Sequence, residues 1–127
     1  HIVFSSPHSD PLLDLASLIR VGSAFRAQLA TALSKIPNIR VTTFCKQNLD
    51  HPSSERINLN YIVEKVKCGP NEFVPKEKIE PYINEFTSKV ALTLKPSKEE
   101  LVFHGHYWDG AKSLLHMKEH IPNATYI

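Results

Sequence analysis

Short runs rich in β-branched residues alternate along this chain with longer segments of helical hydrophobic spacing. Ile2–Ser5 and Ile39–Cys45 are typical of strands, and the apolar residues between them recur at the period of an amphipathic helix. A chain that alternates in this way forms parallel strands joined by right-handed helical crossovers. The sequence therefore predicts a Rossmann-like, doubly wound α/β sheet, with residues 1–127 forming a single domain.

The same patterns predict the remaining elements. Further strands are expected at Tyr61–Val66, at Leu101–Phe103 and from Ala124 to Ile127. Helices are expected over Leu18–Ile36, over Lys76–Leu94 and from Gly110 to about His120. Asp109 is the expected N-terminal cap of the last helix. The polar stretch Lys46–Arg56 is expected to be a loop.

Ligands of doubly wound sheets bind beyond the carboxyl ends of the strands, and two loops there carry reactive side chains. The first, from Ser5 to Leu12, contains hydroxyls, the His8 imidazole and the Asp10 carboxylate. The second runs from His104 to Asp109 and adds Trp108 as a surface on which a sugar can stack. The strands before these loops are expected to be neighbours, so we predict that His8 and His106 share one groove. Lys76 follows the third strand and is expected to reach the same groove.

Each of these features also has a purely structural interpretation. The first loop is explained equally by a proline-braced turn in which Ser and Asp side chains bind backbone donors. His104 and His106 have the spacing of a metal pair, with His8 or Asp109 available as a third ligand, but this signal is weak and we predict no metal. Nearby lysines either meet a phosphate or are solvated surface residues: Lys65, Lys67, Lys76 and Lys78.

Composition argues against several classes of function. The net charge is +2 and charges of both signs are interleaved, so nucleic acid is not an expected partner. No apolar run approaches the roughly 20 residues of a membrane span. A nucleophile elbow, a P-loop and a dinucleotide-binding glycine motif are all missing from the sequence. Cys45 and Cys68 lie far apart, which favours two reduced, buried thiols and a cytoplasmic protein.

Four segments together resemble a known family, and they occur in the order found there. The segments are Ser6–Leu12, Gly69–Phe73 with Pro75–Glu77, Glu80–Phe86 and His104–Asp109. They are similar to the sucrose synthase and sucrose-phosphate synthase branch of glycosyltransferase family 4. The resemblance covers nearly the whole chain and implies a cytoplasmic, two-domain enzyme of carbohydrate metabolism, of which this chain is the N-terminal, acceptor-side domain.

The resemblance also implies roles for individual residues. His106 is the expected catalytic residue, because the matching histidine of the family lies near the transferred sugar. The expected substrate-binding residues are His8, Asp10, Gly22, Lys76, Tyr107 and Asp109. The enzyme would transfer a hexose, with retention, from a nucleotide sugar to a sugar or sugar phosphate. No cofactor is implied, and a C-terminal donor-binding domain is the expected partner.

One segment departs from the family pattern. The family has Gly-Gly-Gln at the start of its first long helix, whereas this chain has Arg20-Val21-Gly22-Ser23. The departure supports an alternative in which the domain is a non-catalytic sugar-binding or regulatory module. A third, weaker hypothesis is a small metal-dependent hydrolase built on His104 and His106. Under the leading hypothesis the natural chain continues beyond Ile127, and this chain alone has no transferase activity.

Overall fold

The computed structural model describes residues 1–8, 10, 21–49 and 51–127. Its strands are β1 (Ile2–Ser6), β2 (Val41–Lys46), β3 (Ser54–Asn58), β4 (Tyr61–Val66), β5 (Val102–Gly105) and β6 (Thr125–Tyr126). Its helices are α2 (Val21–Leu33), the short 3₁₀ helix η1 (Lys76–Lys78), α3 (Glu80–Leu94) and α4 (Tyr107–His120).

The six strands form one sheet in the order β3-β4-β2-β1-β5-β6. β1 lies between β2 and β5 and runs parallel to both. β4 and β6 continue the parallel sheet on either side, and β3 pairs antiparallel with β4. The predicted Rossmann-like α/β fold is confirmed, and so is the predicted pairing of the strands that precede His8 and His106.

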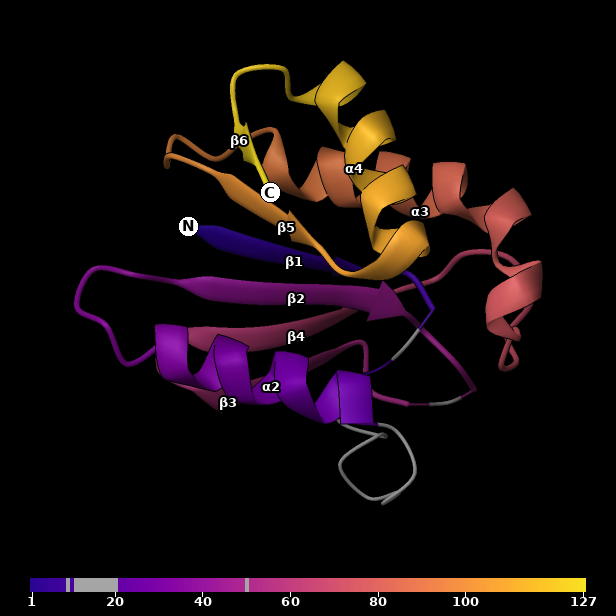
Figure 1. Ribbon diagram of the computed structural model, residues 1–127, viewed down its shortest axis with the longest axis horizontal. Coiled ribbons are helices and arrows are strands. Elements are labelled where there is room, and N and C mark those ends of the chain that lie inside the picture. The colour runs from indigo at the N-terminus through magenta and orange to yellow at the C-terminus, as the bar shows by residue number, and fades with distance from the viewer. Residues whose placement is uncertain (9, 11–20, 50) are drawn as a thin grey trace.

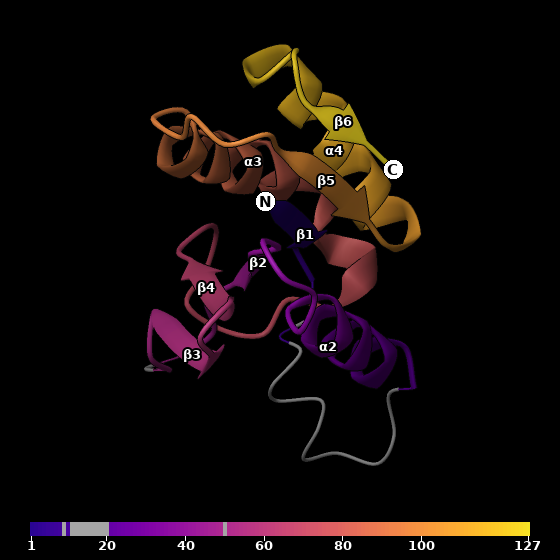
Figure 2. The ribbon, with the colours of Figure 1, turned by 90° about the vertical axis from the view of Figure 1, so that its left-hand side faces the viewer.

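Helices cover both faces of the sheet. α2 packs on one face, and α3 and α4 pack on the other (Figure 1), so that the sheet is the middle layer when the molecule is turned on its side (Figure 2). Side chains alternate between the faces of a strand, and β1 shows the result. Val3 enters the core beneath α3 and α4, whereas Phe4 enters the core on the side of α2.

Two helices differ from prediction near prolines. α2 ends at Leu33 and not at Ile36, because Pro37 disfavours the helical conformation of the residue before it. The predicted helix from Lys76 is divided into η1 and α3. Pro81 has no backbone N–H to donate to Glu77, so a continuous α-helix would lack that hydrogen bond.

Two further expectations are corrected. The predicted loop Lys46–Arg56 is shorter than expected, because Lys46 ends β2 and residues 54–56 belong to β3, an edge strand whose hydrogen bonds come from β4. α4 begins at Tyr107, so Asp109 lies in its first turn and His106 occupies the N-cap position. Asp109 still lies where a negative charge is favoured, at the positive end of the helix dipole. Cys45 and Cys68 are free and buried, as predicted.

Candidate functional site

Two glycines fix the junction between β5 and α4. A Cβ atom on Gly105 would lie 2.8 Å from the backbone carbon of Gly110, closer than real Cβ contacts. The absence of this atom lets the first turn of α4 pack directly on the end of β5. The space beside Gly105 is therefore occupied by the protein's own helix.

Hydroxyl groups of β1 and α3 contact a hydroxyl group of α4. Ser113 Oγ lies 2.7 Å from Ser5 Oγ and 3.1 Å from Thr87 Oγ1, and all three residues are buried. This network joins β1, α3 and α4, because each element contributes one residue to it. The start of α4 is thus positioned by its hydroxyl contacts with β1 and α3 as well as by its packing against β5.

The chain turns sharply between His106 and Tyr107. Tyr107 has a φ of 62°, in the left-handed region that side chains other than glycine seldom adopt. Such conformations cost of order 1–3 kcal/mol and cluster at binding and catalytic sites. The turn directs the Tyr107 ring outward, where 59% of the residue is exposed.

Lys76, Tyr107 and Asp109 come together beside this turn. The Lys76 ammonium lies 4.0 Å from the centroid of the Tyr107 ring and 3.7 Å from Asp109 Oδ1. Arg26 of α2 approaches the same ring, with its guanidinium carbon 6.0 Å from the centroid. A cation over an aromatic face is attracted by the ring quadrupole, so both basic groups are attracted to the Tyr107 ring.

The Asp109 carboxylate is buried but incompletely bound. Its residue is 2% exposed, and Oδ1 accepts no hydrogen bond from any residue that the structure describes. Lys76 at 3.7 Å is an ionic neighbour beyond hydrogen-bond length. A buried acceptor of this kind is suited to receive a hydroxyl donor from a ligand.

His106 belongs to a stack of rings. Its ring lies 4.5 Å from that of His104 and 6.0 Å from that of Phe4, nearly parallel to both, and Phe25 of α2 meets it edge-on at 6.2 Å. Burial, together with the neighbouring His104 and Arg26, lowers the pKa of His106 to about 4. Burial also lowers the pKa of His104. His106 is therefore a neutral imidazole at pH 7, and its buried Nε2 makes no hydrogen bond within the described part of the chain.

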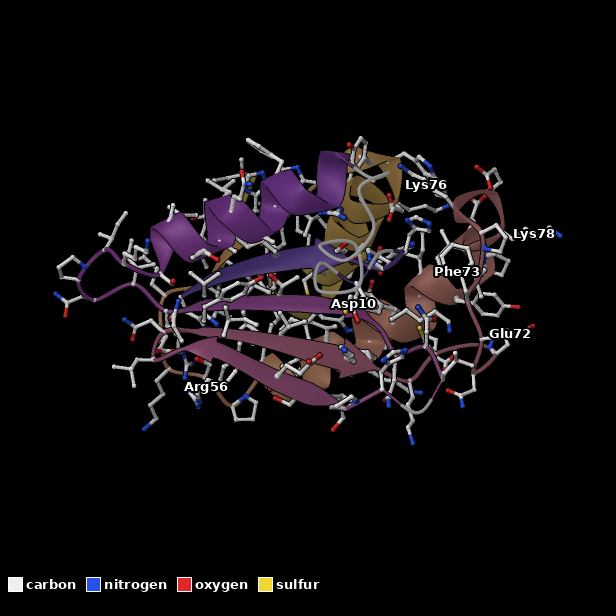
Figure 3. The ribbon with its side chains drawn as sticks, turned by 90° about the horizontal axis from the view of Figure 1, so that it is seen from below. Asp10, Arg56, Glu72, Phe73, Lys76 and Lys78 are labelled. Atoms are coloured by element: carbon white, nitrogen blue, oxygen red, sulfur yellow. The ribbon has the colours of Figure 1, made fainter. Side chains whose placement is uncertain are left out.

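Exposed aromatic side chains surround these groups. Phe25, Phe73, Tyr107 and Trp108 all retain large exposed areas. Figure 3 shows Phe73 and Lys76 at the end of the molecule where the parallel strands finish, with Lys78 pointing outward. His8, in the bend after β1, contacts the Phe73 ring edge-on at 5.7 Å. The loops after β1 and β4 thus meet at this end of the sheet.

The predicted site residues fall into two groups. Lys76, His106, Tyr107 and Asp109 lie within the β5–α4 junction or against it, and the lysine does reach the loop after β5. His8 contacts Phe73 instead, and its predicted sharing of a groove with His106 stays a prediction. Gly22 lies in the first turn of α2, and its role in binding also stays a prediction.

Asp10 is engaged elsewhere. Its carboxylate lies 2.9 Å from the Lys65 ammonium, and both side chains are almost completely buried. Lys65 also contacts Glu55 of β3. Asp10 lies apart from Lys76 in Figure 3. These contacts favour a structural role for Asp10 over the predicted role in substrate binding, and they remove Lys65 from the solvated lysines.

Sequence reasoning missed Phe25 and Arg26. Both belong to α2, which contacts the junction through the His106 and Tyr107 rings. Their helical spacing is typical of ordinary core residues. The available signal was that Arg26 is the single charged residue of α2, at a position that the helical spacing buries, since arginine is seldom buried.

The described residues contain neither a metal-binding cluster nor a membrane-spanning helix. No group of three or more His, Cys, Asp or Glu side chains within ranges 1–8, 10, 21–49 and 51–127 is arranged to hold a metal ion. In the same ranges, none of the helices has the length and apolar character needed to cross a bilayer.

Known proteins resemble this chain in structure. Sucrose-phosphate synthase from Thermosynechococcus elongatus superposes with a TM-score of 0.82 over 98% of the chain, at 18% identity. A second structure of that enzyme gives a TM-score of 0.76 over 99% of the chain, at 15% identity. The chain spans 31% of the first structure and 62% of the second. No protein-family model matches the sequence, and no curated protein matches it significantly.

Proposed function

We propose that this chain is the acceptor-side domain of a retaining glycosyltransferase, which transfers a hexose from a nucleotide sugar to a sugar or sugar phosphate. The observation that carries the proposal is the β5–α4 junction, where a neutral His106 adjoins Tyr107, Asp109 and Lys76. The fold supports it, because the structural resemblance to sucrose-phosphate synthase extends over almost the whole chain.

His106 is the proposed catalytic residue. Hexose transfer passes through a transition state in which positive charge develops on the sugar ring, and fixed dipoles that match this charge accelerate the reaction. An imidazolium would repel that charge, whereas burial keeps the His106 ring neutral at pH 7. The ring stack with His104 and Phe4 holds the imidazole in one orientation, so little reorganisation is needed.

The neighbouring groups suit an acceptor sugar. Asp109 Oδ1 is a buried acceptor for a sugar hydroxyl, and Lys76 can neutralise the phosphate of a sugar phosphate. Tyr107 and Trp108 expose aromatic surface on which the apolar face of a sugar ring can stack. We keep Gly22 and His8 as further binding residues, because each belongs to an element or bend next to this junction.

The remaining parts of the proposal lie outside this chain. A C-terminal domain would bind the nucleotide sugar, and no cofactor would be required beyond this donor substrate. Sugar phosphates are cytoplasmic metabolites, and two free, buried thiols favour the same compartment. A second candidate function is a module that binds sugar without catalysis. It is favoured by the Val21-Gly22-Ser23 segment, which departs from the family's Gly-Gly-Gln.

A transfer assay tests the proposal. The chain would be fused to a nucleotide-sugar-binding domain, and hexose transfer to a hexose 6-phosphate would be measured. We expect His106→Ala to lower the rate about a hundredfold, as removal of one preorganised transition-state contact does in other enzymes. His120→Ala, at the far end of α4, serves as the matched control and should retain full activity. Equal rates for the His106 variant and the control would refute catalysis at this residue.

A further inference from the structure

A separate pocket lies between the loops that follow β2 and β4. Its volume is about 430 Å³, within the range of small-molecule sites. One wall comes from Gln47, Leu49 and His51, and the other comes from residues 67–71. β2 and β4 lie on the opposite side of β1 from β5, so this pocket belongs to a different part of the sheet from the β5–α4 junction.

A buried lysine holds the two walls together. Lys46 Nζ donates to Gln47 O at 3.1 Å and to Asn48 Oδ1 at 3.0 Å on the first loop. It also donates to Pro70 O at 2.6 Å and to Glu72 O at 2.9 Å on the second loop. Backbone hydrogen bonds from Leu49 to Asn71 and from Gln47 to Val66 add to these links. The pocket is therefore shaped by the fold before any ligand arrives.

Gly69 is required by the second wall. Its φ is 59°, and a Cβ atom there would lie 2.6 Å from Tyr82 Cδ1 of α3. Glu85 accepts a hydrogen bond from the Gly69 N–H at 3.1 Å and also binds Lys89. The loop therefore packs on α3. The carboxylate of Glu85 already accepts hydrogen bonds from Gly69 and Lys89.

Gln47 brings an unused acceptor to this pocket. The residue is 8% exposed, and its Nε2 donates to His51 O at 2.8 Å. Its Oε1 is buried and accepts no hydrogen bond from the described residues. Buried acceptors without partners are rare in folded proteins and point to an interaction that is completed by another molecule.

The positive charge of Lys67, which is exposed on one wall of the pocket, favours an anion. His51 on the other wall adds a polar ring. Cys68 also lines the pocket, but burial raises the pKa of its thiol to about 11, so the thiol is protonated and a poor nucleophile at pH 7. The residues that line the pocket are therefore suited to bind a ligand reversibly and not to react with it.

We propose that this pocket binds a small hydroxylated anion, which donates a hydroxyl to Gln47 Oε1 and pairs its phosphate or carboxylate with Lys67. This inference does not depend on the glycosyltransferase proposal, because none of the residues of the β5–α4 junction lines the pocket. A ligand bound here would bridge the loops after β2 and β4.

Titration followed by amide NMR tests this inference with defined probes. Glycerol 3-phosphate represents the phosphate source and gluconate the carboxylate source, while glycerol and acetate each lack one half of the proposed chemistry. We expect saturable shifts at residues 47 and 67–71 with at least one anionic probe, and weaker ones with glycerol and acetate. Lys67→Met should weaken binding about tenfold, as loss of a charged hydrogen bond does. Gln47→Leu should weaken it as well.

Lys95→Met provides the matched control. Lys95 is an exposed lysine at the C-terminal end of α3, outside the pocket, so its loss should leave the dissociation constant unchanged. Equal weakening by Lys95→Met and Lys67→Met would overturn the inference, since it would indicate general attraction to a basic surface. Shifts confined to residues 104–110 would overturn it too, while supporting the β5–α4 junction. If Gln47→Leu fails to fold, the exposed Lys67 decides the question.

Discussion

At the residue scale, burial fixes the protonation of the histidine pair that follows β5. The rings of His104 and His106 stack at 4.5 Å, and burial lowers the pKa of each. A second proton on either ring would place charge in a site with little access to water. The same packing that makes His106 suitable as a neutral dipole therefore makes the junction sensitive to acid.

The first prediction concerns that sensitivity. The pKa of His106 falls from 6.5 in the unfolded chain to about 4 in the folded one, so the unfolded state binds the proton more tightly. Stability should be constant above about pH 6.5 in this respect and should fall as pH decreases toward 4. Urea unfolding at pH 7.5 and pH 5 measures the loss. His106→Gln should reduce the difference between the two pH values; an unchanged difference would contradict the lowered pKa.

The second prediction concerns the buried Lys65. Burial lowers the pKa of its ammonium, but hydrogen bonds to Glu55 and Asp10 outweigh this effect and leave the pKa raised. Lys65→Met would remove the ammonium that contacts both Asp10 and Glu55, and removal of one partner of a buried ion pair costs about 3–5 kcal/mol in comparable cases. Chemical denaturation measures this cost. Asp10→Leu added to Lys65→Met should restore part of the stability, and Lys89→Met, which breaks an exposed pair, should cost much less. A small loss from Lys65→Met would favour a binding role for Asp10.

Residue roles were only partly predictable from sequence. Spacing and resemblance placed His106, Tyr107 and Asp109 in one loop, and the structure brings Lys76 to them. Asp10 and Lys65 are 55 positions apart, and no local pattern signals that they pair. The alternating pattern of β4 predicts a strand with one exposed face. Lys65, however, lies on the same face as the buried Tyr61 and Val63, where its ammonium contacts Asp10 and Glu55.

At the element scale, the predicted strands and helices occur where the sequence has a regular hydrophobic period. The predictions were wrong where contacts distant in sequence determine the secondary structure. The parallel strands are short runs rich in β-branched and aromatic residues, so their existence follows from the sequence. β3 has few apolar residues and forms because β4 offers free hydrogen-bonding groups along its edge. The start of α4 was misplaced by three residues, since Tyr107 enters the helix with a φ of 62° that propensities do not anticipate.

The third prediction tests how tightly α4 is seated. Gly105→Ala would bring a Cβ atom to 2.8 Å from backbone of α4, where neither partner is a flexible side chain. We expect a loss of about 1–3 kcal/mol, the usual cost of overpacking. Gly110→Ala should cost less, because a Cβ atom on Gly110 would lie 3.1 Å from its nearest neighbour, Ser5 O. Unfolding curves of the two variants give the comparison, and a Gly105→Ala protein as stable as the unmodified chain would contradict the observed packing.

At the scale of the whole molecule, the fold would provide one face of the proposed site. The functional groups gather at the carboxyl end of the sheet, as doubly wound folds require. The chain spans 31% of one sucrose-phosphate synthase structure. Under the proposed function, the β5–α4 junction binds the acceptor sugar and a second domain supplies the contacts for the nucleotide sugar.

The fourth prediction follows from this division. The purified chain should show no hexose transfer from any nucleotide sugar, because one domain cannot enclose donor and acceptor together. Its zinc content, measured by elemental analysis, should be far below one ion per chain. Measurable transfer by the chain alone would refute the proposal that donor and acceptor bind to separate domains. Stoichiometric zinc would instead support the hydrolase hypothesis.

The most direct test of the central claim is an amide NMR titration with a hexose 6-phosphate, monitored at residues 76 and 104–110. The account predicts saturable shifts there, weakened about tenfold by Lys76→Met through loss of a charge-assisted contact and unchanged in Lys112→Met. Lys112 is a suitable control because it lies on α4 and pairs with Glu80 at the surface. No shifts at these residues, or shifts that Lys76→Met leaves unchanged, would contradict an acceptor site at the β5–α4 junction.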